Sequence, residues 1–315
     1  MIKPNLRHFF QSDEWAEFQK ALGKEVIEHS SDGWQYMAVK ESGDGKVGHI
    51  FKRLYVPYGP SYSDTNALKQ ALNDLEKVAT EAKVDYVRVE PVCTNLSDQI
   101  SEISGYTKLP KAFQPSLTLI ADLDRPFDEV LQDMTKTNKY LWNKISQNNL
   151  TFSVSDKPED IDKFLQMMTA TAKRTNTQLR DGAYLKVLFG TLGPKQVAHL
   201  AYVYHSGQPL AGALFVDDQL AKTRYYLYAG SFDEARQYNA NSPLLTFLMK
   251  DAHDKGITSF DFFGVSPLDE PKHRWAGLSQ FKRSFGGEER KYIGTWEKPI
   301  RSLRYKLMSL ARKLA

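Results

Sequence analysis

Apolar residues follow two different spacings along this chain, and each spacing predicts a different kind of element. Spacings of three and four residues, from Trp15 to Leu22 and from Leu68 to Ala82, predict amphipathic helices. Runs rich in β-branched and aromatic residues predict strands at residues 25–29, 34–40, 49–56, 86–90 and 116–121. The glycine-rich residues 41–48 predict a hairpin loop, and residues 96–104 a second, weaker helix.

The rest of the chain continues this pattern. Helices are predicted at residues 127–148, 159–174 and 185–188, and strands at 150–154, 199–205 and 210–218. A final helix, at residues 300–315, has a leucine-rich stripe bordered by Lys and Arg. Two interpretations of the stripe stay open: it packs on the body of the protein, or it contacts an anionic membrane.

The two halves share an order of elements, which indicates an internal duplication. The first half runs HIFKRLYVPYGPSYSDT, helix, KVDYVRVEP, and the second runs KTRYYLYAGSFDEARQY, helix, KGITSFDFFGVSP. Common α/β patterning can give the same order without a duplication. We expect an α/β (α+β) protein with two similar modules, each a mixed twisted sheet flanked by helices. Their predicted bounds are residues 1–148 and 149–299, with helix 300–315 packing on the first module.

Composition narrows the class of protein. A chain of 315 residues with 41% hydrophobic and 25% charged residues is typical of a soluble globular protein of two domains. The net charge of +4 permits an anionic partner without requiring one. The single cysteine, Cys93, excludes an intramolecular disulfide, and the scattered histidines predict no metal site. No apolar run reaches signal-peptide or membrane-span length, so we expect a cytoplasmic protein.

The sequence lacks the usual signatures of nucleotide and hydrolase chemistry. It has no GxxxxGK[ST] loop, no GxGxxG after a strand and no GxSxG elbow. Group transfer between two bound substrates fits such a chain, because orientation and charge stabilisation can supply most of the catalysis. Residues 277–287 carry one candidate group: Phe281 and Phe285, at i and i+4, can anchor a short helix and hold Lys282 rigidly. Alone, this stretch also fits an amphipathic turn with a solvated cation.

Several stretches, in order along nearly the whole chain, resemble the Fem family of peptidoglycan-bridge aminoacyltransferases. The N-terminal residues Phe10-Gln11-Ser12 with Trp15 resemble the opening of that family. The other matching stretches are Gln114-Pro115 before a strand ending at Leu123, a cationic segment at 139–150, YYLYAGS at 225–231, SFDFFGV at 259–265, and residues 277–287 with Tyr292-Ile293-Gly294.

The resemblance implies a fold and an activity. The fold is a tandem pair of acetyltransferase-like (GNAT-like) domains, here in a compact form, since no heptad segment for a coiled-coil arm lies inside the second domain. The activity is transfer of an amino acid from aminoacyl-tRNA, as co-substrate, to the stem peptide of a UDP-linked or lipid-linked muramoyl-peptide precursor. It requires no cofactor and no metal. The implied location is the cytoplasm, at the inner face of the membrane, with peripheral contact.

The resemblance also implies roles for particular residues. Lys282, with Phe281, matches a pair implicated in donor binding and in stabilising the transition state. Glu90, before Pro91, occupies a position where the family has an aspartate, and the longer side chain puts its catalytic role in question.

Further matching positions concern substrate binding. Arg180 and Tyr184 match positions that contact the diphosphate of the acceptor. Tyr226 and Tyr228 alternate along a strand, so we expect them to share one face, which lines either the acceptor groove or the core. Gln19 stands where some members have a phosphate-binding lysine, and Lys20 follows one helical step away.

Two alternative functions remain. One is a GNAT-type acyl-CoA N-acyltransferase acting on a small amine. The loop at residues 230–242 disfavours it, because that loop lacks the glycine spacing that cradles a pyrophosphate, and Asp233 and Glu234 would repel one. The other is a non-catalytic module that binds RNA or the precursor.

Overall fold

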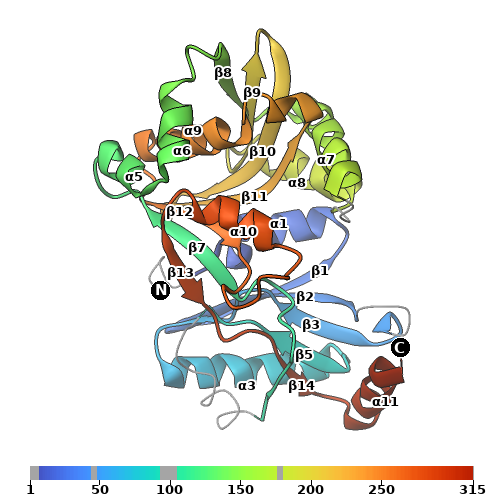
Figure 1. Ribbon diagram of the computed structural model, residues 1–315. Helices are drawn as coiled ribbons and strands as arrows, with labels where there is room; N and C mark the ends of the chain where they lie inside the picture. The colour runs from blue at the N-terminus through green and yellow to red at the C-terminus, as the bar shows by residue number, and fades with distance from the viewer. Residues whose placement is uncertain (1–6, 44–47, 93–104, 176–179, 315) are drawn as a thin grey trace. The chain divides into compact units, whose positions relative to one another are not determined.

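The computed structural model describes residues 7–43, 48–92, 105–175 and 180–314, so the helix predicted at residues 96–104 lies outside the described residues. The chain forms two compact units (Figure 1): unit 1 is Met1–Ser116 with Lys291–Ala315, and unit 2 is Leu117–Arg290. These divisions differ from the predicted bounds at 148/149 and 299/300. The reason is the pairing of two strands near the boundaries. Strand β7 (Leu117–Asp122) pairs with β12 (Ser259–Gly264) of unit 2, and β14 (Trp296–Pro299) pairs with β5 (Tyr86–Val89) of unit 1.

Unit 1 is one mixed sheet covered by a long helix. The strand order is β1-β2-β3-β5-β14-β6, and β4 pairs with β2. Helix α3 (Thr65–Glu81), capped by the side chain of Asp64, buries its leucines against this sheet. The other elements of unit 1 are η2 (Phe9–Gln11), α1 (Asp13–Ala21), β1 (Glu25–Ser31), β2 (Trp34–Ser42), β3 (Lys52–Val56), β4 (Ser61–Tyr62), β5 (Tyr86–Val89), β6 (Thr107–Lys108) and α11 (Ser302–Leu314).

Unit 2 has a second mixed sheet, in the order β13-β7-β12-β11-β10-β9-β8. Helix α9 (Asn241–Asp254) buries Leu244, Leu245 and Leu248 in the core of this unit. The other elements are α5 (Phe127–Asp133), α6 (Lys136–Asn143), β8 (Leu150–Ser155), η3 (Pro158–Asp160), α7 (Ile161–Thr175), α8 (Gly182–Leu192), β9 (Ala198–His205), β10 (Gln208–Asp218), β11 (Thr223–Ser231), η4 (Asp233–Arg236), β12 (Ser259–Gly264), α10 (Ala276–Arg283) and β13 (Glu288–Lys291).

Both units contain the repeated strand–helix–strand arrangement. In unit 1, β3 and β5 are parallel and α3 lies between them in sequence. In unit 2, β11 and β12 are parallel and α9 lies between them in sequence. An antiparallel strand then follows the parallel pair in each sheet, β14 beside β5 and β7 beside β12. The predicted mixed α/β fold class is therefore confirmed.

The prediction of one continuous helix over residues 127–148 is wrong. This segment divides into α5 and α6, because Met134 is extended (φ −73°, ψ 152°) and Thr135 starts a new helix. The side chain of Thr135 accepts a hydrogen bond from the amide of Asn138, and its own amide donates to Ser284. A local cap and a tertiary bond thus interrupt a helical pattern that continues in the sequence.

Helix α11 packs on unit 1, but through residues other than its leucine stripe. Met308 is fully buried in a cluster with Phe51 and Tyr86, and Tyr305 packs beside them. Leu303, Leu307 and Leu310 are exposed. The interpretation in which this stripe packs on the body is therefore wrong. Among the described residues, no helix is long and apolar enough to cross a membrane.

Candidate active site

Helix α10 holds Lys282 on its buried side. The Lys282 side chain is only 6% exposed, and its Nζ donates a hydrogen bond of 2.8 Å to the carbonyl oxygen of Gly264, at the end of β12. Ser279, one turn earlier, is fully buried, and its hydroxyl oxygen accepts hydrogen bonds from the amide and from the hydroxyl of Ser266 at 2.7 and 3.0 Å. The helix and the end of β12 are therefore tied together at two points.

The two phenylalanines anchor α10 as the sequence predicts. Phe285 is fully buried in the core of unit 2, and the Phe281 ring contacts it edge to face at 5.1 Å between centroids. The helix ends at Arg283, and Gly286 and Gly287 follow with φ values of 83° and 99°. A Cβ on Gly287 would approach the carbonyl oxygen of Ile120 to 2.7 Å, so glycine permits the close contact with β7.

Asp261, on β12, is the charged group that influences Lys282. Its carboxylate is 2% exposed, and Oδ1 accepts hydrogen bonds from the Thr118 hydroxyl and from the amide of Phe263 at 2.7 Å. Phe263 adopts a left-handed conformation (φ 63°) where the β12–β7 register shifts. Asp261 thus holds the irregular end of β12 that presents the Gly264 carbonyl.

Burial determines the charge state of both groups. Burial lowers the pKa of Lys282 from 10.5 to about 8, and the negative charge of Asp261 partly opposes this change. Burial likewise raises the pKa of Asp261 to about 6, opposed by its hydrogen bonds and by the charges of Lys282 and Arg290. Near neutral pH both groups are mainly ionised, although little water reaches either of them.

The ammonium of Lys282 can serve an incoming ligand. An ammonium has three N–H donors, and the described residues supply one hydrogen-bond acceptor to it. A fixed cation with remaining donors in a poorly hydrated place stabilises negative charge that develops on a nearby oxygen. The geometry is therefore suited to a reaction that passes through an oxyanion.

The structure brings three of the predicted substrate-binding residues together on unit 2. The Arg180 guanidinium lies 4.5 Å from the centroid of the Tyr184 ring, and Tyr228 is close enough to Tyr184 to influence its pKa. Burial, then Tyr228, raises the pKa of Tyr184, whereas the charge of Arg180 acts in the opposite direction. Arg180 itself is exposed, so this cluster joins a cation to two aromatic hydroxyls at the surface.

Tyr226 does not join this cluster, which corrects the prediction that Tyr226 and Tyr228 share a face. The β10–β11 register shifts there: Tyr228 pairs with Leu214 and Tyr226 with Phe215, so Leu227 is an extra residue. Since Leu214 and Phe215 are consecutive, their side chains point to opposite faces, and so do the two tyrosines. Tyr226 packs against the core of unit 2.

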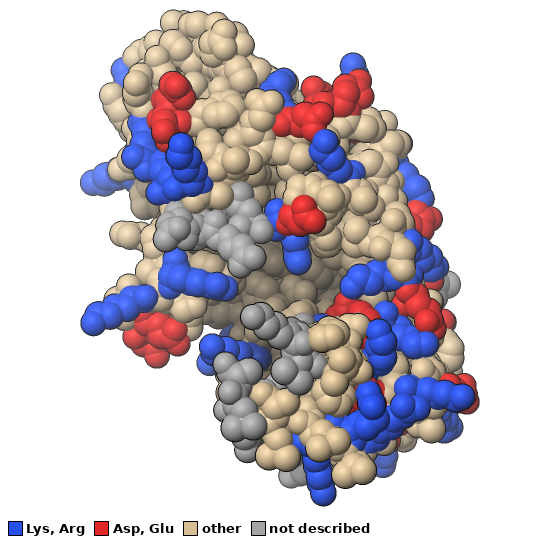
Figure 2. All heavy atoms as spheres, turned by 90° about the vertical axis from the view of Figure 1, so that its right-hand side faces the viewer, with Lys and Arg blue, Asp and Glu red and all other residues tan. Residues whose placement is uncertain are grey.

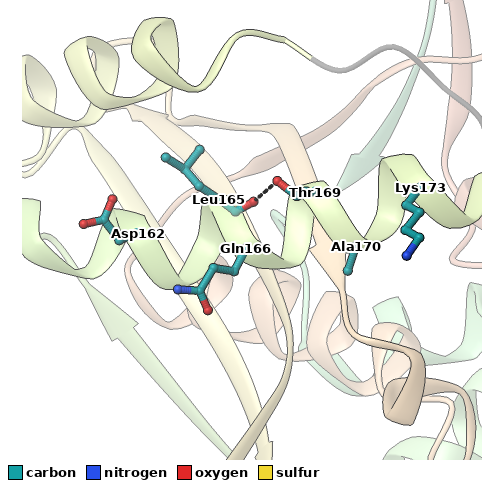
Figure 3. A pocket seen from close by; sticks show the side chains of 6 residues that line it. All are labelled: Asp162, Leu165, Gln166, Thr169, Ala170 and Lys173. Carbon is teal, nitrogen blue, oxygen red and sulfur yellow. Dashed lines mark hydrogen bonds between the residues drawn. The ribbon is translucent and has the colours of Figure 1, made fainter.

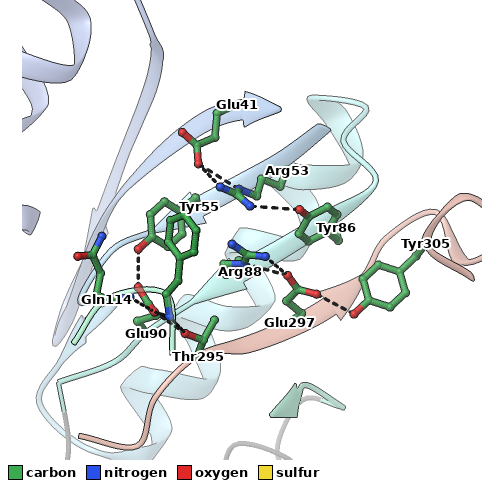
Figure 4. Close-up of polar contacts among 11 residues, drawn as sticks. Glu41, Arg53, Tyr55, Tyr86, Arg88, Glu90, Gln114, Thr295, Glu297 and Tyr305 are labelled. Carbon is green, nitrogen blue, oxygen red and sulfur yellow. Dashed lines mark hydrogen bonds and ion pairs between the residues drawn. The ribbon is translucent and has the colours of Figure 1, made fainter. Parts of the chain in front are cut away.

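Glu90 lies in a different environment, within unit 1 (Figure 4). It is 3% exposed and accepts hydrogen bonds from the hydroxyls of Tyr55 and Thr295, and from the amides of Phe113 and Gln114 at 3.0 and 2.8 Å. Four donors thus converge on one carboxylate. This arrangement connects β3, the end of β5, residues 113–114 and the start of β14, as a structural anchor would.

The remaining predicted site residue, Lys20, is on the surface of unit 1. Lys20 forms an ion pair of 2.5 Å with Glu28, and its side chain is 51% exposed. Its neighbour Gln19 is buried, in agreement with the helical step that separates the two side chains. The substrate-binding role of Lys20 stays a prediction.

Two further features are separate from these residues. An open hollow is lined by six residues of α7 (Figure 3): Asp162, Leu165, Gln166, Thr169, Ala170 and Lys173. None of these six is a predicted site residue. In the part of the chain that the structure describes, no group of three His, Cys, Asp or Glu side chains is arranged to hold a metal ion.

Sequence reasoning did not assign a role to Asp261 or Thr118. A signal was present, because Asp261 interrupts an aromatic strand between Phe260 and Phe262, and a carboxylate in a buried strand requires partners. Its neighbour in space, Thr118, comes from a strand 143 positions earlier, and no local pattern connects the two.

Comparisons with known proteins agree with the expected family. Residues 203–313 match the model of the FemAB family. A lipid II:glycine glycyltransferase of Staphylococcus haemolyticus (strain JCSC1435) is 22% identical, over 95% of this chain and 89% of that protein. The protein of the same name from Staphylococcus aureus (strain USA300) is 21% identical over the same shares. The first alignment extends over 385 positions, more than the 315 residues here, so that relative has insertions that this compact chain lacks.

Solved structures agree on the fold. A crystal structure of FemX matches with a TM-score of 0.82 at 18% identity, over 95% of this chain and 94% of that chain. A tandem GNAT protein from the clavulanic acid biosynthesis pathway matches with a TM-score of 0.55 at 8% identity, over 91% and 94%. The predicted tandem GNAT-like fold is thereby confirmed, while the resemblance to the Fem family is supported by the family-model match and by the two glycyltransferases.

Proposed function

We propose, from the similarity of this chain to the Fem family, that it is an aminoacyltransferase of peptidoglycan-bridge synthesis. Its relatives are named for transfer of glycine to lipid II, and they align with nearly the whole chain. The acceptor would be a lipid-linked muramoyl-peptide precursor and the donor an aminoacyl-tRNA. The protein would work in the cytoplasm at the inner membrane face, without a cofactor or metal.

The buried ammonium of Lys282 is the observation that supports this proposal most strongly. The amine of the acceptor would attack the ester carbonyl of the donor, so that a C–N bond forms and negative charge builds on the carbonyl oxygen. Lys282 would stabilise that charge through the N–H groups that Gly264 does not engage. The C–O ester bond then breaks, the tRNA leaves with a free hydroxyl, and the amine loses a proton.

Other residues would support binding of the two substrates. Phe281 would keep α10 seated, since its ring packs on Phe285. Arg180, with Tyr184 and Tyr228, would bind the diphosphate of the acceptor, because a guanidinium can hold two phosphate oxygens at once. Glu90 would act through the fold of unit 1, given its four hydrogen-bond donors.

The test is a reconstituted transfer reaction. Purified protein is mixed with charged tRNA and lipid II, or with the UDP-linked precursor, and the acceptor is analysed by mass spectrometry. We expect one amino acid or more to be added to the stem peptide. Absence of product with every charged tRNA and both acceptors would refute the proposal, and thermal stabilisation by CoA would favour an acyl-CoA N-acyltransferase instead.

A further inference from the structure

We propose that α11 is a membrane-docking element, whose exposed leucine stripe enters the interfacial layer of an anionic bilayer. The stripe consists of Leu303, Leu307 and Leu310, which are 74%, 55% and 59% exposed. Their spacing of four and three residues places them on one side of the helix. Three large apolar side chains therefore face solvent on consecutive turns.

The opposite side of α11 fixes this orientation. Met308 is fully buried with Phe51 and Tyr86, and the Tyr305 hydroxyl donates a hydrogen bond of 2.8 Å to Glu297. At about 100° per residue, Tyr305 and Met308 lie roughly opposite the centre of the leucine stripe. The leucines are thus turned away from unit 1 by the contacts that hold the helix, and folding of the unit does not bury them.

The charges around the stripe indicate the kind of partner. Residues 300–315 contain five Lys or Arg residues and no Asp or Glu. Lys306 is exposed beside the stripe, and Arg304 forms an ion pair of 2.5 Å with Asp85. Figure 2 shows many Lys and Arg side chains, with Asp and Glu side chains among them, on one face of the molecule. An apolar stripe with an exposed lysine beside it matches acyl chains below anionic headgroups.

A bilayer as the partner of the leucine stripe also agrees with the proposed function, and the choice of a bilayer rests partly on that function. The relatives are named for action on lipid II, a lipid-linked acceptor. Docking through α11 would keep the protein at the surface that carries such an acceptor. The docking itself requires neither substrate nor turnover, so it can be measured independently of transfer.

The test is co-sedimentation of the full chain with vesicles. We compare phosphatidylglycerol vesicles with phosphatidylcholine vesicles at low and at physiological salt. The test variant is Leu303→Gln/Leu307→Gln/Leu310→Gln. The matched control is Leu220→Gln/Leu268→Gln, which removes two leucines of unit 2 that are 65% and 75% exposed. All these side chains are on the surface, and circular dichroism verifies that the variants are folded.

We expect the wild type and the control to bind phosphatidylglycerol vesicles. Both proteins should bind phosphatidylcholine vesicles more weakly, and both should bind phosphatidylglycerol vesicles more weakly at physiological salt than at low salt. The test variant should lose at least about tenfold in partition coefficient, since three apolar side chains no longer leave water. Lys306→Glu should reduce binding to the anionic vesicles selectively.

Three outcomes would overturn the inference. The first is that the wild type fails to bind phosphatidylglycerol vesicles, and the second is that the test variant binds them as well as the wild type does. The third is that the wild type forms a dimer, the test variant is a monomer, and neither binds vesicles. The last result would assign the stripe to a second copy of the chain. If the wild type bound vesicles but catalysed no transfer, the result would contradict the proposed function and leave the docking inference intact.

Discussion

Each unit has a buried carboxylate where its parallel strand pair ends, and the two carboxylates have different partners. In unit 1 the recorded β3–β5 pairing ends at Val89, and Glu90 follows it. In unit 2 the recorded β11–β12 pairing ends at Asp261. Glu90 receives four hydrogen bonds from neutral donors, whereas Asp261 receives two, both on Oδ1, and acts on the pKa of Lys282.

This difference separates a structural role from a chemical one within the same kind of arrangement. A carboxylate that accepts four hydrogen bonds from neutral donors on different segments holds those segments together. A carboxylate near a buried ammonium keeps that cation charged at a higher pH than burial alone would allow. The comparison predicts that substitutions at the two positions have separable effects on stability and on catalysis.

The largest effect is expected for Lys282→Ala. Removing the ammonium should reduce the turnover of transfer about 10²- to 10³-fold, as loss of one oxyanion-stabilising donor does in other enzymes. Single-turnover kinetics with saturating donor and acceptor measure it. Lys272→Ala, which removes an exposed lysine of the same unit, is the control and should retain full activity. A folded Lys282→Ala protein with near-normal turnover would exclude Lys282 from the reaction.

A large loss of stability is expected for Glu90→Ala. It leaves the hydroxyls of Tyr55 and Thr295 and two amides without their acceptor, which should cost about 3 kcal/mol of unfolding free energy. Urea denaturation measures the change. The folded fraction should keep its turnover to within a few-fold. An unchanged unfolding midpoint together with lost activity would reverse the assignment and make Glu90 a catalytic group.

A pH effect is expected for Asp261→Asn. Because the ammonium form of Lys282 is required, and its pKa is about 8, activity should fall as pH rises through about 8. Asp261 raises this pKa, so its neutralisation should move the alkaline limb of the profile to lower pH. Thr118→Val is the matched variant that removes a hydrogen bond and keeps the charge, and it should leave the limb in place. Equal profiles for wild type and Asp261→Asn would contradict the coupling.

The smallest effects concern the two tyrosines of β11. Tyr228→Phe removes the hydroxyl that influences Tyr184, and it should raise the KM for the acceptor a few-fold with kcat little changed. Tyr226→Phe should leave KM unchanged, because Tyr226 packs in the core on the other face of the sheet. If Tyr226→Phe raised KM as much as Tyr228→Phe does, the proposed division between the two faces would be wrong.

The sequence predicted elements well where local patterns determine them. The apolar spacing from Leu68 to Ala82 specifies α3, and the Phe281–Phe285 pair specifies how α10 packs. Predictions were less successful where distant segments decide the outcome. The Thr135 break and the pairing of β14 with β5 depend on partners far along the chain, and the extra residue Leu227 depends on how β11 pairs with β10. The same holds for the site, since Lys282 is apparent locally but its contacts with Gly264 and Asp261 come only from the fold.

The most direct test is a measurement of the Lys282 pKa itself. The protein is labelled with carbon-13 at the lysine ε-carbons, and the Lys282 signal is assigned by its absence in Lys282→Arg and followed by NMR as pH rises. We predict a midpoint near 8 in the wild type and a lower one in Asp261→Asn, because burial opposes the charge and Asp261 supports it. A midpoint near the ordinary 10.5 in the wild type, unmoved in Asp261→Asn, would contradict the account of this site.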